Sequence, residues 1–112
     1  MTLRMREPTY FILAALQDEP LHGYAIITRA GELSQGRVRL ATGTLYSALD
    51  RLAGEGLVES VRAEIVNGRA RRYYALTPGG RAALHAEAAV MVQAARVVTN
   101  RATSPRPAEG IA

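Results

Sequence analysis

The dipeptide Asn67-Gly68 constrains the fold of this chain more than any other feature. It separates two stretches rich in β-branched and aromatic residues, GLVESVRAEIV and RARRYYALT, and both alternate with the two-residue period of a strand. Asn-Gly suits the left-handed backbone of a tight hairpin turn. We therefore predict a β-hairpin here. The polar residues 69–71 leave open a loop longer than two residues.

Three segments with helical periodicity lie before the hairpin in the sequence, and one lies after it. The segment TYFILAALQDE is apolar on most sides and predicts a buried first helix that Pro20 stops. A second helix is expected over residues 21–34. Its start is His22 and Gly23, and Tyr24 is expected to be largely buried, on one face with Ile27.

The third helical segment reads TGTLYSALDRLAGEG. Leu45, Leu49 and Leu52 form one stripe at helical spacing. Thr42 is a suitable N-cap, and the glycines on either side of Glu55 end the helix. Its first turn is unusually small and hydroxylated.

The last helix begins with Thr77 as N-cap and a proline at the first helical position. Its alanine-rich sequence carries apolar residues alternately four and three apart, which is the spacing of a helix-pairing seam. We expect this seam to make a dimer, with the alanines allowing close approach. Its residues are Leu84, Ala88, Met91, Ala95 and Val98.

The expected order is helix, helix, helix, hairpin, long helix. This is a mainly α fold with a small β-hairpin, the winged helix-turn-helix plan, in which the third helix enters the DNA major groove. We expect a winged-helix domain over residues 1–77, a dimerisation helix over 78–101 and a disordered tail over 102–112.

Composition limits the function. The 112 residues suit one small domain and include no cysteine, and all 14 basic residues are arginine, for a net charge of +4. Arginine grips phosphate in bidentate fashion. The two histidines lie far apart, and no nucleophile triad, phosphate loop or metal-ligand spacing is present, so we expect no enzyme, no metal and no cofactor. With no apolar run that could span a bilayer and no signal peptide, we expect a cytoplasmic protein without a membrane partner.

Three blocks carry a resemblance to a known family: LHGYAI, GTLYSALDRLAGEGLVES and NGRARRYYALTPGGRAAL. In this order and spacing they resemble the PadR family of bacterial transcriptional regulators, in its small form. The resemblance implies a homodimeric repressor that binds double-stranded DNA. A small-molecule effector or a stress signal would release it. Two recognition helices on a two-fold axis imply a pseudo-palindromic operator.

The predicted DNA contacts lie in the third helix and the wing. Thr42, Thr44 and Ser47 are small enough for the backbone to approach DNA, and the Tyr46 hydroxyl suits a phosphate. Arg51 suits a guanine edge or a phosphate, or is simply solvated. Arg72 is the expected exception in the wing, because its strand parity places it with Tyr74. The full prediction is Thr42, Thr44, Tyr46, Ser47, Arg51, Gly68, Arg69, Arg71 and Arg72.

Two other functions remain open at this stage. The chain could be a winged-helix module that binds a protein through its long helix, or a small-molecule sensor built around a dimer cavity. The protein-binding hypothesis gains if Arg51, Arg69 and Arg71 do not share a face with Thr44 and Tyr46.

Overall fold

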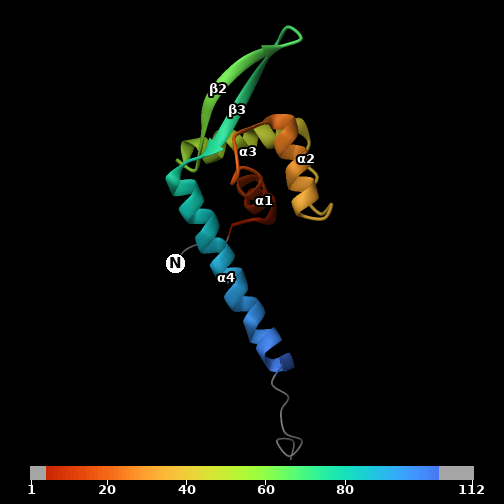
Figure 1. Ribbon diagram of the computed structural model, residues 1–112, viewed down its shortest axis with the longest axis vertical. Helices are drawn as coiled ribbons and strands as arrows, with labels where there is room; N and C mark the ends of the chain where they lie inside the picture. The colour runs from red at the N-terminus through yellow and green to blue at the C-terminus, as the bar shows by residue number, and fades with distance from the viewer. Residues whose placement is uncertain (1–4, 104–112) are drawn as a thin grey trace, which may run out of the picture.

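The fold places a winged helix-turn-helix at one end of a long helix (Figure 1). In the computed structural model, which describes residues 5–103, the elements are α1 (Glu7–Ala15), β1 (Leu21–His22), α2 (Gly23–Leu33), α3 (Thr42–Gly54), β2 (Val58–Val66), β3 (Arg69–Leu76) and α4 (Pro78–Thr103). The predicted fold class is confirmed. The strand β1 was not foreseen. The predicted tail from residue 104 onward lies outside the described residues, and α4 continues two residues past its expected end.

Helix α1 is the centre of the core. Ile12, Leu13 and Leu16 are fully or almost fully buried, together with the two alanines between them, as its apolar sequence predicted. The helix ends at Ala15, four residues before the predicted end. The reason is that residues 17–19 are exposed and have no apolar surface to bury. Asp18 instead pairs with Arg29 of α2 at 3.0 Å.

Helix α2 begins at Gly23, capped by His22, whose Nδ1 accepts a hydrogen bond from the Ala25 N–H at 3.4 Å. Its buried face contains Ile26 and Ala30. Tyr24 was predicted to be buried, and this is wrong: its side chain is 75% exposed. It precedes Ile26 by two residues, a rotation of about 200° around the helix, and therefore lies opposite the core.

Helix α3 carries the predicted stripe of Leu45, Leu49 and Leu52, all fully buried. Thr42 is not its N-cap. The helix begins one residue early because the Ala41 carbonyl already accepts from the Leu45 N–H at 2.9 Å, and the cap position has no side-chain hydrogen bond.

The C-terminus of α3 is closed by two further hydrogen bonds. The Leu57 and Gly56 N–H groups donate to Leu52 and Ala53, and Gly56 is left-handed at φ 79°. This is the Schellman arrangement that glycine favours.

The hairpin turn has only two residues. Asn67 and Gly68 have φ 52° and 76°, as a type I′ turn requires, and the ladder continues to Val66 opposite Arg69. The longer loop is therefore excluded. Strand β3 is central in the antiparallel sheet β1-β3-β2, and a register shift between Ser60 and Arg62 bulges β2.

The root of α4 is fixed to the end of α3. The Thr77 hydroxyl donates to the Gly56 carbonyl at 2.6 Å and accepts from the Gly80 N–H at 2.9 Å, which supports the predicted capping role of Thr77. Leu84 belongs to the core of its own chain and is only 3% exposed. Little of its surface is left for the predicted dimer seam, because the side chain is already covered within its own chain.

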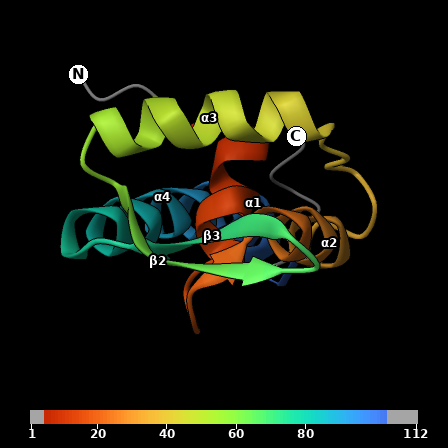
Figure 2. The same ribbon diagram turned by 90° about the horizontal axis from the view of Figure 1, so that it is seen from above.

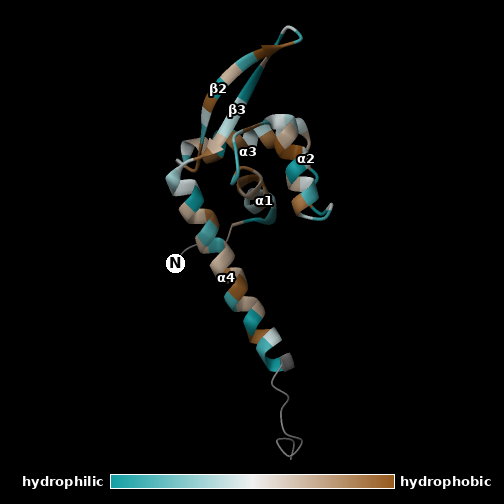
Figure 3. Cartoon of the chain, viewed as in Figure 1, coloured by the Kyte–Doolittle hydropathy of each residue, from teal (hydrophilic) through white to brown (hydrophobic). Residues whose placement is uncertain are grey.

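Beyond its first turns α4 leaves the body of the protein. It extends away from the hairpin, and apolar and polar residues alternate along its exposed half (Figures 1 and 3).

Candidate nucleic-acid interface

The first two turns of α3 form an exposed polar surface. Thr42, Thr44, Tyr46 and Ser47 are all exposed, while the leucine stripe on the other side holds the helix against the core. The predicted contacts in this helix, Arg51 apart, thus lie on its outward arc. Free N–H groups at a helix N-terminus also attract anions.

Tyr46 lies at the junction of α3 and α2. A Cβ added to Gly23 would lie 2.9 Å from the ring carbon Cζ of Tyr46 and closer still to its hydroxyl oxygen. Glycine is therefore required at position 23 for this approach, as the sequence suggested. The Tyr46 side chain remains 39% exposed.

The wing brings two of its arginines to the same place. Arg69 and Arg71 line a recess of about 420 Å³ together with Tyr46, Tyr24 and His22. We call this the α2–wing recess. The hairpin and α3 lie on opposite sides of α1 when seen along the long axis (Figure 2), and the recess lies between α2 and the wing. Tyr46, Arg69 and Arg71 share a face in the sense that all three line this recess.

Arg72 and Gly68 occupy other parts of the wing. Gly68 forms the turn at the tip. Arg72 is exposed, pairs in register with Ala63, and is absent from the lining of the recess. It follows Arg71 directly, and successive side chains of a strand point to opposite faces. The predicted parity of Arg72 with Tyr74 agrees with this position.

Arg51 does not join this surface. Its guanidinium donates to the Thr9 hydroxyl of α1 at 3.1 Å and lies 3.5 Å from the Glu55 carboxylate. It lines a different cavity, of about 610 Å³, beside α4. The structure thus separates Arg51 from Tyr46 and the wing arginines, although the sequence prediction placed them on one DNA-binding surface. Arg51 follows Tyr46 by five residues, a rotation of about 140° around the helix, so the two side chains leave α3 on different flanks.

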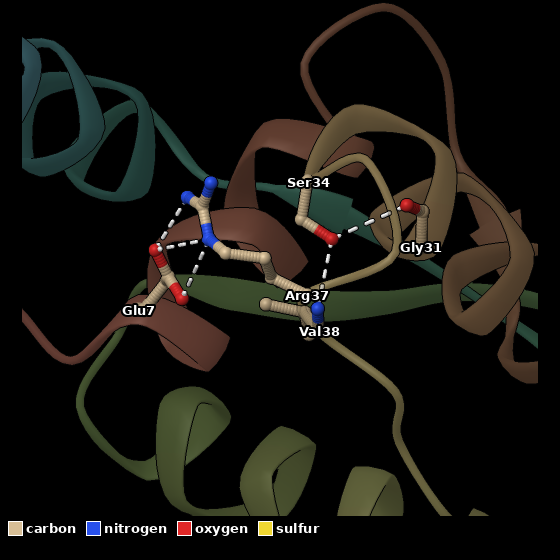
Figure 4. Close-up of polar contacts among 5 residues, drawn as sticks. All are labelled: Glu7, Gly31, Ser34, Arg37 and Val38. Carbon is tan, nitrogen blue, oxygen red and sulfur yellow. Dashed lines mark hydrogen bonds and ion pairs between the residues drawn. The ribbon is translucent and has the colours of Figure 1, made fainter.

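A small network holds the turn between α2 and α3 (Figure 4). The Ser34 hydroxyl is buried, donates to the Gly31 carbonyl at 3.2 Å and accepts from the Val38 N–H at 2.9 Å. Arg37 donates to the Glu7 carboxylate, with the shortest contact at 2.6 Å. Hydrogen bonding to Arg37 lowers the pKa of Glu7, and the same contact raises the pKa of Arg37. The Arg37 guanidinium is therefore paired with a carboxylate of α1.

A second network supports the base of the wing. The Tyr73 hydroxyl donates to the Glu64 carboxylate at 2.7 Å, and the Arg62 guanidinium lies 4.1 Å from the centre of the Tyr73 ring. His22 packs edge-on against the same ring at 5.5 Å. Burial, and next the charge of Arg71, lower the pKa of His22. The wing is thereby tied to the start of α2.

Tyr24 is the residue of this surface that the sequence reasoning missed. Its signal was available: with the helix starting at Gly23 and with Ile26 and Ala30 as the core face, position 24 faces outward. Among residues 5–103, no group of three metal-ligating side chains comes together. None of the helices described is long and apolar enough to cross a membrane.

Helix α2, its turn, α3 and the hairpin define a winged helix-turn-helix protein. Residues 12–86 match the Transcriptional regulator PadR-like family. The chain therefore belongs to this family, as its sequence blocks indicated, and the family is one of transcriptional regulators.

Two curated proteins illustrate the sequence similarity. The chain is 44% identical over 87 residues to Transcriptional regulator Rv3488 of Mycobacterium tuberculosis, covering 78% of each protein. It is 40% identical over 91 residues to an uncharacterized 37.1 kDa protein in transposon Tn4556 of Streptomyces fradiae. That match covers 81% of this chain and 25% of the Streptomyces protein.

Two solved structures illustrate the similarity of fold. A PadR-like transcription factor from Bacteroides fragilis has a TM-score of 0.68 and 30% identity, covering 82% of this chain and 86% of that one. Bacillus subtilis PadR, crystallised in complex with operator DNA, has a TM-score of 0.63 and 28% identity over 71% of this chain. The match covers 46% of the Bacillus chain, so the present chain spans less than half of that protein.

Proposed function

We propose that this chain is a homodimeric repressor that binds a pseudo-palindromic operator through α3 and the wing. The observation that carries the proposal is the shared face of Tyr46, Arg69 and Arg71 beside the exposed first turns of α3. Bacillus subtilis PadR, which has this fold, was crystallised with its operator. Arg51 lies on another flank of α3, so we leave it out of the proposed DNA contacts. Arg69 and Arg71 line the same recess as Tyr46, which supports DNA binding over the protein-binding alternative.

DNA binding is tested by selecting bound fragments from genomic DNA and measuring affinity for the selected duplex. Removing two phosphate contacts per protomer with Arg69→Ala plus Arg71→Ala should weaken binding to every duplex. It should also reduce the slope of log affinity against log salt by about 0.9 for each phosphate that is no longer neutralised. Arg81→Ala, on α4 and bonded to the Gln17 carbonyl, is the control. Unchanged affinity and slope in the double variant would remove the wing from the interface.

Base discrimination is assigned to the outward residues of α3. Thr44→Ala and Ser47→Ala should narrow the difference in affinity between the selected duplex and an unrelated one. The salt slope should stay constant, because neither residue carries charge. Equal affinity ratios in variant and wild type would contradict a reading role for these residues.

Dimerisation is assigned to the exposed part of the α4 seam. Ala95 and Val98 are exposed, Val98 to 70%, and Ala88 and Met91 are half-buried. A second copy would cover them. Val98→Glu should shift the chain toward monomer in sedimentation experiments and weaken operator binding. Gln93→Glu, away from the seam, is the matched control, and a dimer that survives Val98→Glu would contradict this assignment.

A small-molecule effector would find room beside α4. The cavity of about 610 Å³ between α1, α3 and α4 has the size of ordinary ligand pockets. The cavity lies between α3, the proposed DNA-binding helix, and α4, the proposed dimer helix. A ligand bound there would change the position of α3 relative to α4. Release of the selected duplex by a compound that also raises the melting temperature would test this part of the proposal.

A further inference from the structure

The α2–wing recess has a lining with a clear chemical preference. Its lining residues include two arginines, Arg69 and Arg71, and two tyrosines, Tyr24 and Tyr46, and no acidic residue among the described ones lines it. Glu64 lies opposite Arg71 in the ladder, but its carboxylate accepts the hydrogen bond from Tyr73. Donors without acidic side chains suit an anion.

Tyr24 gives the recess a feature that packing does not explain. The phenol ring is large and apolar, yet it is 75% exposed on the first turn of a helix whose other face supplies the core. Exposed tyrosines are common at binding surfaces, where the ring lies against a partner and the hydroxyl donates to it. Tyr24 lines the recess together with Tyr46 and with residues of the wing.

Arg71 is less exposed than its two neighbouring arginines of the wing, Arg69 and Arg72. It is half-buried, and the neighbouring strand positions are tied down by the contacts among Tyr73, Glu64 and His22. A preorganised guanidinium loses less side-chain entropy when it binds.

We propose that the α2–wing recess binds one phosphodiester group of each DNA half-site, held between Tyr24, Tyr46 and Arg71. A single phosphate would then be bound by the helix-turn-helix and the wing together, which sets the angle between them on the duplex. The inference rests on the DNA-binding function proposed above, and it adds Tyr24 to the interface.

The first test uses three variants on the selected duplex and on an unrelated duplex. Tyr24→Phe removes only the hydroxyl and should lower affinity about three- to tenfold per protomer on both duplexes, the effect of one hydrogen bond in each half-site, with the salt slope unchanged. Arg71→Gln should lower affinity on both and reduce the slope by about 0.9 per protomer. Arg72→Gln, the neighbouring arginine outside the recess, should change affinity less than Arg71→Gln.

The second test identifies the phosphate. Selected duplexes are prepared with a single neutral methylphosphonate linkage, moved one position at a time. One linkage per half-site should weaken the wild type but have little further effect on Tyr24→Phe and Arg71→Gln, because these variants already hold that phosphate weakly. Arg72→Gln should keep the wild-type profile.

The outcomes separate the two proposals. If the wild type binds no duplex, the proposed function fails. If the wild type binds DNA and Tyr24→Phe and Arg71→Gln bind equally well, or respond to different linkages, only the phosphate site in the recess is overturned. Circular dichroism melting of each variant ensures that affinities are compared between folded proteins.

Discussion

Replacement of Ser34 by alanine should loosen the turn that presents α3. The Ser34 side chain is 1% exposed, and its hydroxyl bridges the Gly31 carbonyl and the Val38 N–H (Figure 4). In the Ser34→Ala variant the Gly31 carbonyl still accepts a hydrogen bond, because the Gly36 N–H donates to it at 2.8 Å. The N–H of Val38, a residue only 4% exposed, loses its acceptor.

The cost follows from that single unpaired group. A buried donor left without a partner destabilises a fold by about 1–3 kcal/mol, and the loss of one oxygen atom leaves almost no cavity. In a domain of this size each kcal/mol lowers the melting temperature by about 4–8 °C. DNA affinity should also fall at temperatures where the variant is folded, because the turn sets the position of α3.

The assay is urea unfolding of both proteins at one fixed protein concentration, since dimerisation would make stability depend on concentration. We expect a lower midpoint at an unchanged slope. Ser60→Ala, at an exposed serine of β2, should stay within about 0.5 kcal/mol of the wild type. A Ser34→Ala variant that unfolds like the wild type would refute the reasoning, because Val38 would then have found another acceptor.

Three further outcomes are expected. Gly80→Ala should destabilise the fold strongly, because the new Cβ would collide with the carbonyl of Leu57; a melting temperature equal to the wild type would contradict the close contact at the root of α4. Leu49→Ala, at a fully buried position, should cost about 2–5 kcal/mol in urea titrations, and a smaller loss would mean that α3 is not held by its leucine stripe. Burial, followed by the charge of Arg71, lowers the pKa of His22 from 6.5, so the folded state prefers the neutral ring and the free energy of unfolding should fall as the pH drops below 6.5. The variant His22→Asn keeps a side-chain acceptor for the helix cap. Its free energy of unfolding should lack the His22 contribution to the pH dependence between about pH 7.5 and about pH 5.5. An unchanged pH dependence in this variant would show that another group causes it.

The order of elements could be predicted because each signal was local. The leucine stripe of α3, the Asn-Gly turn and the Thr77 cap each depend on residues within a few positions of one another. Boundaries were less certain where no such signal existed. The end of α1 shows this: nothing in residues 16–19 breaks a helix, and the chain leaves it because those residues have nothing to pack against.

The candidate site was predicted in part for the same reason. Exposure of Thr44, Tyr46 and Ser47 followed from the position of the leucine stripe. The different flanks of Tyr46 and Arg51 also follow from their spacing on the helix. The hydrogen bond that holds Arg51 against α1 was not predicted, because its partner Thr9 lies 42 residues away. The exposure of Tyr24 was not predicted, because the sequence analysis placed Tyr24 on one face with Ile27, whereas the buried face of α2 contains Ile26 and Ala30.

Sequence patterns predicted a helix-turn-helix, an arginine-rich hairpin that forms the wing, and a long helix with an apolar seam. Helical and strand periods, caps and turn residues are short-range properties, so they can be read along the chain. The burial of Leu84 in the core, and the recess that Tyr24, Tyr46, Arg69 and Arg71 line, became visible in the folded chain. Those relations arise from the packing of α4 against α1 and of both α3 and β3 against α2, and sequence spacing alone does not contain them.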